Sequence, residues 1–118
     1  RICAVLRNAK ELGINYGLKF YAPELLNHER ERELVGLLAQ YPKVLLSAAQ
    51  LRQPHRVARY IEELAAQYHR FYNDCRVLPL GDEKVSDLNS ARATLSQATA
   101  QVISNGLDLL GVNAPEKM

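Results

Sequence analysis

Residues 55–75 read HRVARYIEELAAQYHRFYNDC and carry the clearest periodic signal in the chain. Apolar side chains recur there at alternating spacings of four and three, which places them on one face of an α-helix. They are Val57, Ile61, Leu64, Tyr68, Phe71 and Cys75. Such a seam suits packing at a shallow angle against a neighbour, so the stretch predicts the long helix of a bundle.

The segments on either side repeat the helical spacing, and none combines period-two alternation with enrichment in β-branched residues. Glycine or proline marks most of the ends, because glycine favours helix stops and proline favours helix starts. We therefore predict an all-α fold, an antiparallel bundle of about five helices. The expected helices cover residues 1–12, 28–41, 42–51, 54–75 and 87–110.

Several helix ends carry recognisable signals. Gly13 is the expected stop of the first helix, and Asn27 is the expected N-cap of the second. Glu29 and Glu31 fall in the first turn of that second helix, where carboxylates suit the positive end of the helix dipole. Glu31 and Glu33 are two residues apart and do not face a common point, so we expect both on a solvated face.

Length and composition bound the class of protein. At 118 residues the chain fits one domain with its own hydrophobic core. Its 47% apolar and 24% charged residues are typical of soluble proteins, and no run approaches the roughly 20 apolar residues of a membrane span. We therefore expect a cytoplasmic protein with no membrane partner. Because a helical pattern already runs at Arg1, we interpret residues 1–118 as a fragment of a longer chain with its first helix truncated.

The sequence offers no convergent set of catalytic groups. The histidines at positions 28, 55 and 69 lack the i, i+4 pairing of a helical zinc site, and Cys3 and Cys75 form no C-x-x-C pair. Because no strand is predicted, a Gly-rich loop of the nucleotide-binding kind is excluded as well. We expect no catalytic residue, no metal and no cofactor in this chain.

Basic side chains offer better candidates for binding. Arg52, Arg56 and Arg59 fall at spacings of four and three, so they line one face if the helical register extends back past the intervening proline. They are candidate phosphate contacts. The alternative is that they form a solvent-exposed face whose positive charges balance those of neighbouring glutamates. The net charge of +2 permits nucleic-acid binding without demanding it.

An aromatic side chain near the end of the long helix is a second binding candidate. Tyr72 and Arg76 are four residues apart and share a strip outside the apolar seam. A tyrosine beside an arginine suits a splayed RNA base, since stacking on such a side chain is worth about 1–3 kcal/mol per base. Packing in the core is the alternative for this tyrosine.

Four stretches of the chain stand out together: PHRVARYIEELA at 54–65, YHRFYNDCRVL at 68–78, YPKV at 41–44 with Ala48-Ala49, and GLDLLGVNAPEKM at 106–118. They resemble the C-terminal anticodon-binding domain of arginyl-tRNA synthetases, of the DALR type. The resemblance implies a helix bundle of the class Ia synthetase anticodon-binding type that binds tRNA-Arg. It places catalysis, with ATP and Mg²⁺, in the catalytic domain of the parent chain, whose signature motifs are absent from this sequence. It implies no DNA partner, and we expect a monomer.

The same resemblance assigns roles to five residues. Arg1 and Arg7 match the end of the first helix motif, where the family contacts the anticodon loop. Tyr72 and Arg76 match positions that face the loop from the long helix, and Met118 matches the chain-terminal methionine that approaches it. We expect the tyrosine to stack on a base, the arginines to contact phosphates or base edges, and the methionine to make apolar contact.

Two departures and two alternatives accompany the resemblance. Residues 91–97, ARATLSQ, are less apolar than the usual family pattern, and Lys117 stands where arginine is usual. One alternative is a helical protein-interaction or oligomerisation domain, supported by the apolar seam of the long helix. The other is the anticodon-binding domain of a related class I synthetase.

Overall fold

Helices make up the domain in the computed structural model, which describes residues 2–17, 23–75, 77 and 86–111. They are α1 (Ile2–Glu11), α2 (Glu29–Ala39), α3 (Tyr41–Leu51), α4 (His55–Asp74) and α5 (Asp87–Leu109), with a short 3-10 helix, η2 (Pro23–Leu25), before α2. No strand occurs within the described ranges. The predicted all-α fold and its five helices are therefore confirmed.

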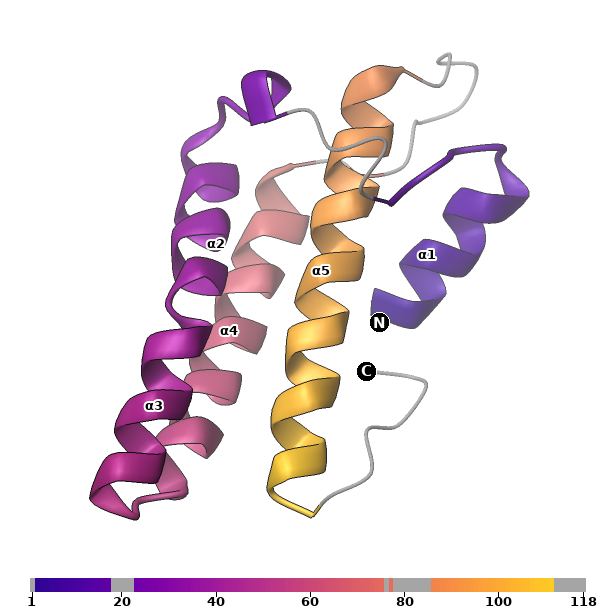
Figure 1. The fold of residues 1–118 in the computed structure, drawn as a ribbon. Coiled ribbons are helices and arrows are strands. Elements are labelled where there is room, and N and C mark those ends of the chain that lie inside the picture. The colour runs from indigo at the N-terminus through magenta and orange to yellow at the C-terminus, as the bar shows by residue number, and fades with distance from the viewer. Residues whose placement is uncertain (1, 18–22, 76, 78–85, 112–118) are drawn as a thin grey trace.

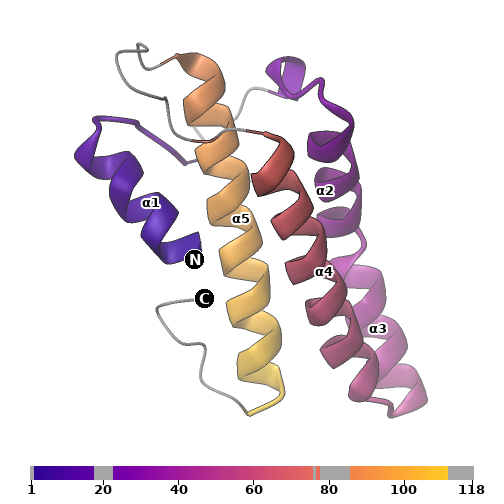
Figure 2. The same cartoon turned by 180° about the vertical axis from the view of Figure 1, so that it is seen from behind.

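The helices stand side by side, with α4 and α5 at the centre (Figures 1 and 2). On one side of α4, α2 and α3 follow each other along its length, and α5 covers the other side. α1 packs against the far side of α5. The chain runs in opposite directions along α4 and its two neighbours, so the bundle is antiparallel at its core, as predicted.

The seam of α4 forms the centre of the hydrophobic core. All six of its predicted apolar positions are buried, and Leu64 and Phe71 are fully shielded from solvent. Leu34 of α2 and Ile103 of α5 meet this seam from the two sides. The periodicity that predicted the long helix therefore also predicted which of its faces is buried.

α5 contacts its neighbours through small side chains. Its buried residues include Ala91, Ala93, Ser96, Thr99 and Gly106. The hydroxyls of Ser96 and Thr99 donate to backbone carbonyls one turn earlier, at 3.1 and 2.9 Å. A Cβ atom at Gly106 would lie 2.5 Å from Cδ1 of Ile61, so glycine permits the close approach of α5 to α4. The low apolarity of residues 91–97 therefore reflects tight helix contacts.

Gly13 ends α1 as predicted. Its φ of 79° is the left-handed conformation that glycine adopts without strain. The amide of Gly13 donates to the carbonyl of Lys10 at 3.1 Å, and the amide of Ile14 donates to that of Ala9 at 2.9 Å. This pair of bonds is a Schellman motif, and it turns the chain away from the helix axis.

The cap of α2 differs from the prediction, because His28 and not Asn27 occupies the N-cap. The His28 ring Nδ1 accepts a hydrogen bond from the amide of Arg30 at 3.0 Å. The Glu31 carboxylate in turn accepts a bond from the amide of His28 at 2.9 Å. A histidine thus takes the role usually filled by serine, threonine, aspartate or asparagine in a capping box.

The segment Glu29–Leu51, which spans α2 and α3, is one candidate membrane span by length and composition among the described residues. Its most apolar window reaches a mean hydropathy of 1.2. The core helix of a soluble protein can have the same length and apolar composition. Leu34, Leu37 and Ala48 of this segment belong to the core. The signal is therefore weak.

Candidate nucleic-acid interface

Arg7 lies on the outer side of α1. Ile2, Val5 and Ala9 form the buried face of this helix, which packs against α5. Arg7 is two residues from both Val5 and Ala9, so it projects from the opposite side, and its side chain is exposed. The guanidinium is therefore accessible to a ligand that approaches α1 from solvent.

Tyr72 lies in the last turns of α4 and is half-buried. Its ring is stacked on that of Tyr68, with centroids 6.3 Å apart and planes inclined by 25°. Tyr68 is itself buried, and its hydroxyl donates to Oγ of Ser96 on α5 at 3.0 Å. Tyr72 therefore rests on an aromatic ring that is anchored to α5, and part of its surface stays open to solvent.

The remaining three residues assigned by resemblance, Arg1, Arg76 and Met118, lie outside the described residues. The described pair, Arg7 and Tyr72, comes from α1 and α4, which pack on two sides of the same helix, α5 (Figures 1 and 2). The convergence of all five residues on one surface remains a prediction.

An ion pair joins α2 to the end of α4 that carries Tyr72. Nε of Arg30 on α2 lies 2.8 Å from Oδ2 of Asp74, the last residue of α4. This hydrogen bond raises the pKa of Arg30 above its ordinary value, so the arginine stays charged. Cys75 follows directly and is buried, which raises the pKa of its thiol. A protonated thiol in the core is the role expected for this cysteine.

Glu31 corrects an expectation, because it is buried and not solvated. Its side chain is 1% exposed, and its Oε2 lies 2.7 Å from Nε of Arg92 on α5. The other carboxylate oxygen accepts the amide of His28. The spacing His28-x-x-Glu31 is typical of a capping box and could have predicted the bond to the amide of His28. The ion pair with Arg92 could not be predicted in this way, because Arg92 is 61 residues away in the sequence.

The helical register on which the arginine stripe at residues 52–59 depends is broken at Arg52, and a phosphate contact by Arg52 stays a prediction. Arg52 terminates α3 with φ of 52°, and α4 begins only at His55, so the helical register does not extend back to Arg52. Arg56 and Arg59 do share α4, and both line an open groove between α3 and α4 with a volume of about 530 Å³. The groove is a feature that spacing along a single helix could not reveal.

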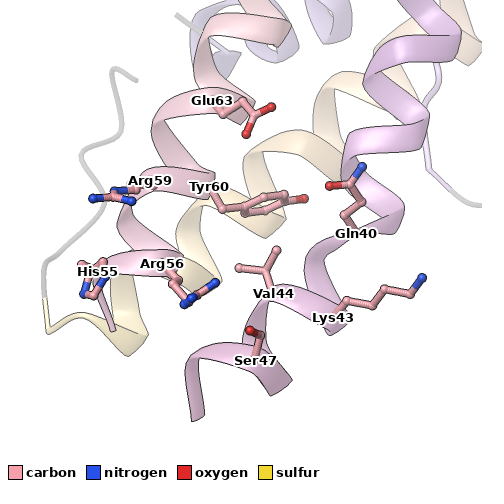
Figure 3. Close-up of a pocket in the computed structure, with 9 residues that line it drawn as sticks. All are labelled: Gln40, Lys43, Val44, Ser47, His55, Arg56, Arg59, Tyr60 and Glu63. Atoms are coloured by element: carbon pink, nitrogen blue, oxygen red, sulfur yellow. The ribbon is translucent and has the colours of Figure 1, made fainter. Parts of the chain in front are cut away.

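Figure 3 shows the groove and the side chains that line it. Gln40, Lys43, Val44 and Ser47 come from α3 and the residue before it, and His55, Arg56, Arg59, Tyr60 and Glu63 come from α4. His55 and Arg59 lie along the α4 edge, and Lys43 lies on the opposite edge. Cationic side chains therefore border the groove on both sides.

Tyr60 forms the inner wall of this groove. Its hydroxyl donates to the backbone carbonyl of Leu37 at 2.6 Å. The ring is stacked on Tyr41, with centroids 5.7 Å apart. Burial raises the pKa of Tyr60 to about 12, and it raises the pKa of Tyr41 as well. The tyrosine pair thus joins α2, α3 and α4 as a neutral, rigid unit.

Comparison with known proteins identifies the family. The sequence pattern of the DALR anticodon binding domain matches residues 1–118. The chain belongs to this family. It is also 54% identical over 118 residues to an arginine–tRNA ligase of Clavibacter sepedonicus. That alignment covers all of this chain and 21% of the relative, so the DALR domain spans about a fifth of the length of that protein.

The polar side chains in the described part of this DALR domain show neither a metal-binding cluster nor an unpaired buried atom. Among the described residues, no three His, Cys, Asp or Glu side chains gather where they could hold a metal ion. Every buried side-chain nitrogen or oxygen in the same part of the chain has a hydrogen-bond partner, so no buried polar group is left aimed at a missing ligand.

The seam of α4 also bears on the oligomerisation alternative. Its six apolar residues are 0–7% exposed, because α2, α3 and α5 of the same DALR domain cover them. Apolar residues that are buried within their own domain offer no surface to a second chain. The observation that favoured an oligomerisation domain is therefore explained by the fold of one chain.

Proposed function

We propose that this domain binds the anticodon loop of tRNA-Arg within a longer arginine–tRNA ligase polypeptide. The observation that carries the proposal is the 54% identity to an arginine–tRNA ligase over the full 118 residues. That relative is almost five times as long, which leaves ample chain for a separate catalytic domain. ATP and Mg²⁺ would bind there, and arginine would be activated and transferred there in the cytoplasm. This domain would position the tRNA.

Two described side chains suit the two parts of an RNA loop. Arg7 is exposed and always charged, which fits a backbone phosphate. Tyr72 presents part of a ring that is held in place by Tyr68, and a fixed ring stacks on a splayed base without losing further side-chain entropy. We assign phosphate or base-edge contacts to Arg1 and Arg76 and an apolar contact to Met118, as the resemblance implies.

We assign arginine, and not the amino acid of a related class I synthetase, because the relative from Clavibacter sepedonicus is an arginine enzyme and its alignment covers all 118 residues of this chain. A related synthetase would be supported if the full-length polypeptide charged a different tRNA. We propose that the polypeptide acts as a monomer on tRNA, without DNA or a membrane as partner.

The direct test is a titration of the full-length polypeptide with labelled tRNA-Arg at two salt concentrations. We expect affinity to fall steeply with salt, because each phosphate contact releases condensed counterions. A tRNA of another specificity should bind more weakly. Equal affinity for both tRNAs, or affinity that does not change with salt, would contradict the proposal.

A pair of variants at position 72 separates ring stacking from packing. Tyr72→Phe keeps the ring and should keep the affinity, whereas Tyr72→Leu keeps apolar volume but loses the ring. Loss of stacking on one base weakens binding by about 1–3 kcal/mol, which is roughly 5-fold to 150-fold. Unchanged affinity in Tyr72→Leu, with the fold intact by circular dichroism, would remove this residue from the interface.

A further inference from the structure

The lining of the groove between α3 and α4 carries a positive charge. Lys43, Arg56 and Arg59 border it, and Glu63 is the single carboxylate among its lining residues. Three cations against one anion give the lining a net charge of +2 with histidine neutral. In Figure 3 the Arg56 side chain lies between the two helices, and Arg59 and Lys43 extend outward from opposite rims of this open groove of about 530 Å³.

These three cations are not engaged in holding the fold. Arg30 and Arg92, by contrast, each pair with a carboxylate at 2.8 or 2.7 Å. Within the described part of the chain, no ion pair joins Lys43, Arg56 or Arg59 to any carboxylate, including the nearby glutamates of α4. Arg56 and Arg59 are exposed, as the alternative of a solvated face expects, and neither of them is held in an ion pair with a glutamate that the structure describes.

The groove suits a phosphate better than a base. Tyr60 is only 4% exposed, and Tyr41 is stacked on it, so its ring offers little surface for stacking. Nε of Arg56 donates to Oε1 of Gln53, which orients the guanidinium and leaves its terminal nitrogens as donors. Ser47 adds a hydroxyl. Exposed cations and a hydroxyl without an open ring are the groups that contact RNA backbone.

The groove is separate from the surface that carries Tyr72. Arg59 and Tyr72 are 13 positions apart on α4, which corresponds to about 20 Å along the helix axis and to faces about 140° apart around it. A phosphate at the groove therefore belongs to a different part of the RNA than a base stacked on Tyr72.

We propose that the groove between α3 and α4 is a phosphate site that binds the tRNA backbone outside the anticodon loop, through Lys43, Arg56 and Arg59. The proposal rests on the tRNA-binding function proposed above. The contact is independent of sequence, because only the backbone phosphate is recognised. It would anchor the tRNA against the side of the bundle formed by α2, α3 and α4.

The experiment compares Lys43→Gln and Arg59→Gln with Arg32→Gln in the full-length polypeptide. Arg32 is an exposed arginine of α2 that does not line the groove, so it is the matched control. Each groove variant should weaken tRNA binding about threefold at moderate salt and lower the slope of log K against log salt by about 0.7–0.9, and Arg32→Gln should change neither. Equal slopes in all four proteins would overturn the proposal.

Two further measurements identify the ligand. Ethylation of single tRNA phosphates should interfere with binding at a position outside the loop in the wild type, and that interference should vanish in Arg59→Gln. A titration with inorganic phosphate, followed by NMR, should show no saturation below the millimolar range. Tight binding of inorganic phosphate with unchanged tRNA slopes would make the groove a small-anion site and would overturn the RNA assignment.

The outcomes also separate this proposal from the proposed function. If the wild type fails to bind tRNA-Arg, the anticodon-binding function itself is wrong. If the wild type binds and Tyr72→Leu weakens binding while the groove variants do not, the function stands and only the groove assignment fails.

Discussion

Replacement of Glu31 by alanine tests the buried contact between α2 and α5. The carboxylate is 1% exposed, bonds Nε of Arg92 at 2.7 Å and caps α2 through the amide of His28 at 2.9 Å. Removing one partner of a buried pair costs about 3–5 kcal/mol, because the other charge stays buried. Arg92 is 15% exposed and has a further interaction partner, so we expect a loss near the lower end, about 3 kcal/mol.

Urea unfolding followed by circular dichroism measures this loss. With a slope of about 1.5–2 kcal/mol per molar, the midpoint should fall by about 1.5–2 M. Glu29→Ala is the matched control: Glu29 is an exposed glutamate in the same first turn of α2, and its loss should cost less than about 1 kcal/mol. In an Arg92→Ala background, Glu31→Ala should lower the free energy of unfolding by only about 1 kcal/mol, because only the hydrogen bond that caps α2 is then lost. A full 3 kcal/mol loss in that background would refute the ion pair as the cause.

Three further substitutions probe the backbone, a buried phenol and a helix contact. Arg52→Gly relieves the left-handed conformation at φ of 52° and should stabilise the domain by about 1 kcal/mol in thermal melts; a lower melting temperature would contradict this. Tyr60→Phe removes the bond to Leu37 and should cost about 1 kcal/mol near pH 7. Because burial raises the pKa of Tyr60 to about 12, its stabilisation is complete below pH 10 and is lost as the pH rises through about 12. The phenylalanine variant should therefore lose less stability than the wild type over that range, and parallel pH profiles would refute this. Gly106→Val should destabilise the domain by about 1–3 kcal/mol, because even a Cβ would lie 2.5 Å from Ile61; an unchanged urea midpoint would show that α5 can shift at no cost.

The sequence predicted those parts of the fold that depend on local signals. The seam of α4 and the stop at Gly13 follow from spacing and from the conformational preferences of glycine, and both are confirmed. Arg52 was misassigned because an arginine occupies a left-handed position that usually favours glycine. Glu31 was misassigned because its partner lies on another helix, and periodicity along one helix carries no information about such contacts.

In the candidate interface, too, local features could be predicted from the sequence and contacts between helices could not. Tyr72 was expected on a more exposed strip, and the structure finds it half-buried beside a buried Tyr68. The groove needed the structure, because Lys43 belongs to α3 and Arg59 to α4, and their convergence depends on how the two helices pack. Of the five residues taken from the resemblance, the structure describes Arg7 and Tyr72.

The small side chains of α5 make that helix a spacer of fixed thickness. α1 and α4 press on it from two sides, and alanine, serine, threonine and glycine at the contacts bring their axes close together. A bulkier residue at Ala93 or Thr99, both fully shielded, would wedge the neighbouring helices apart. The distance between α1, which carries Arg7, and α4, which carries Tyr72, is thus set by the side-chain size of α5. α5 itself need not contact the RNA.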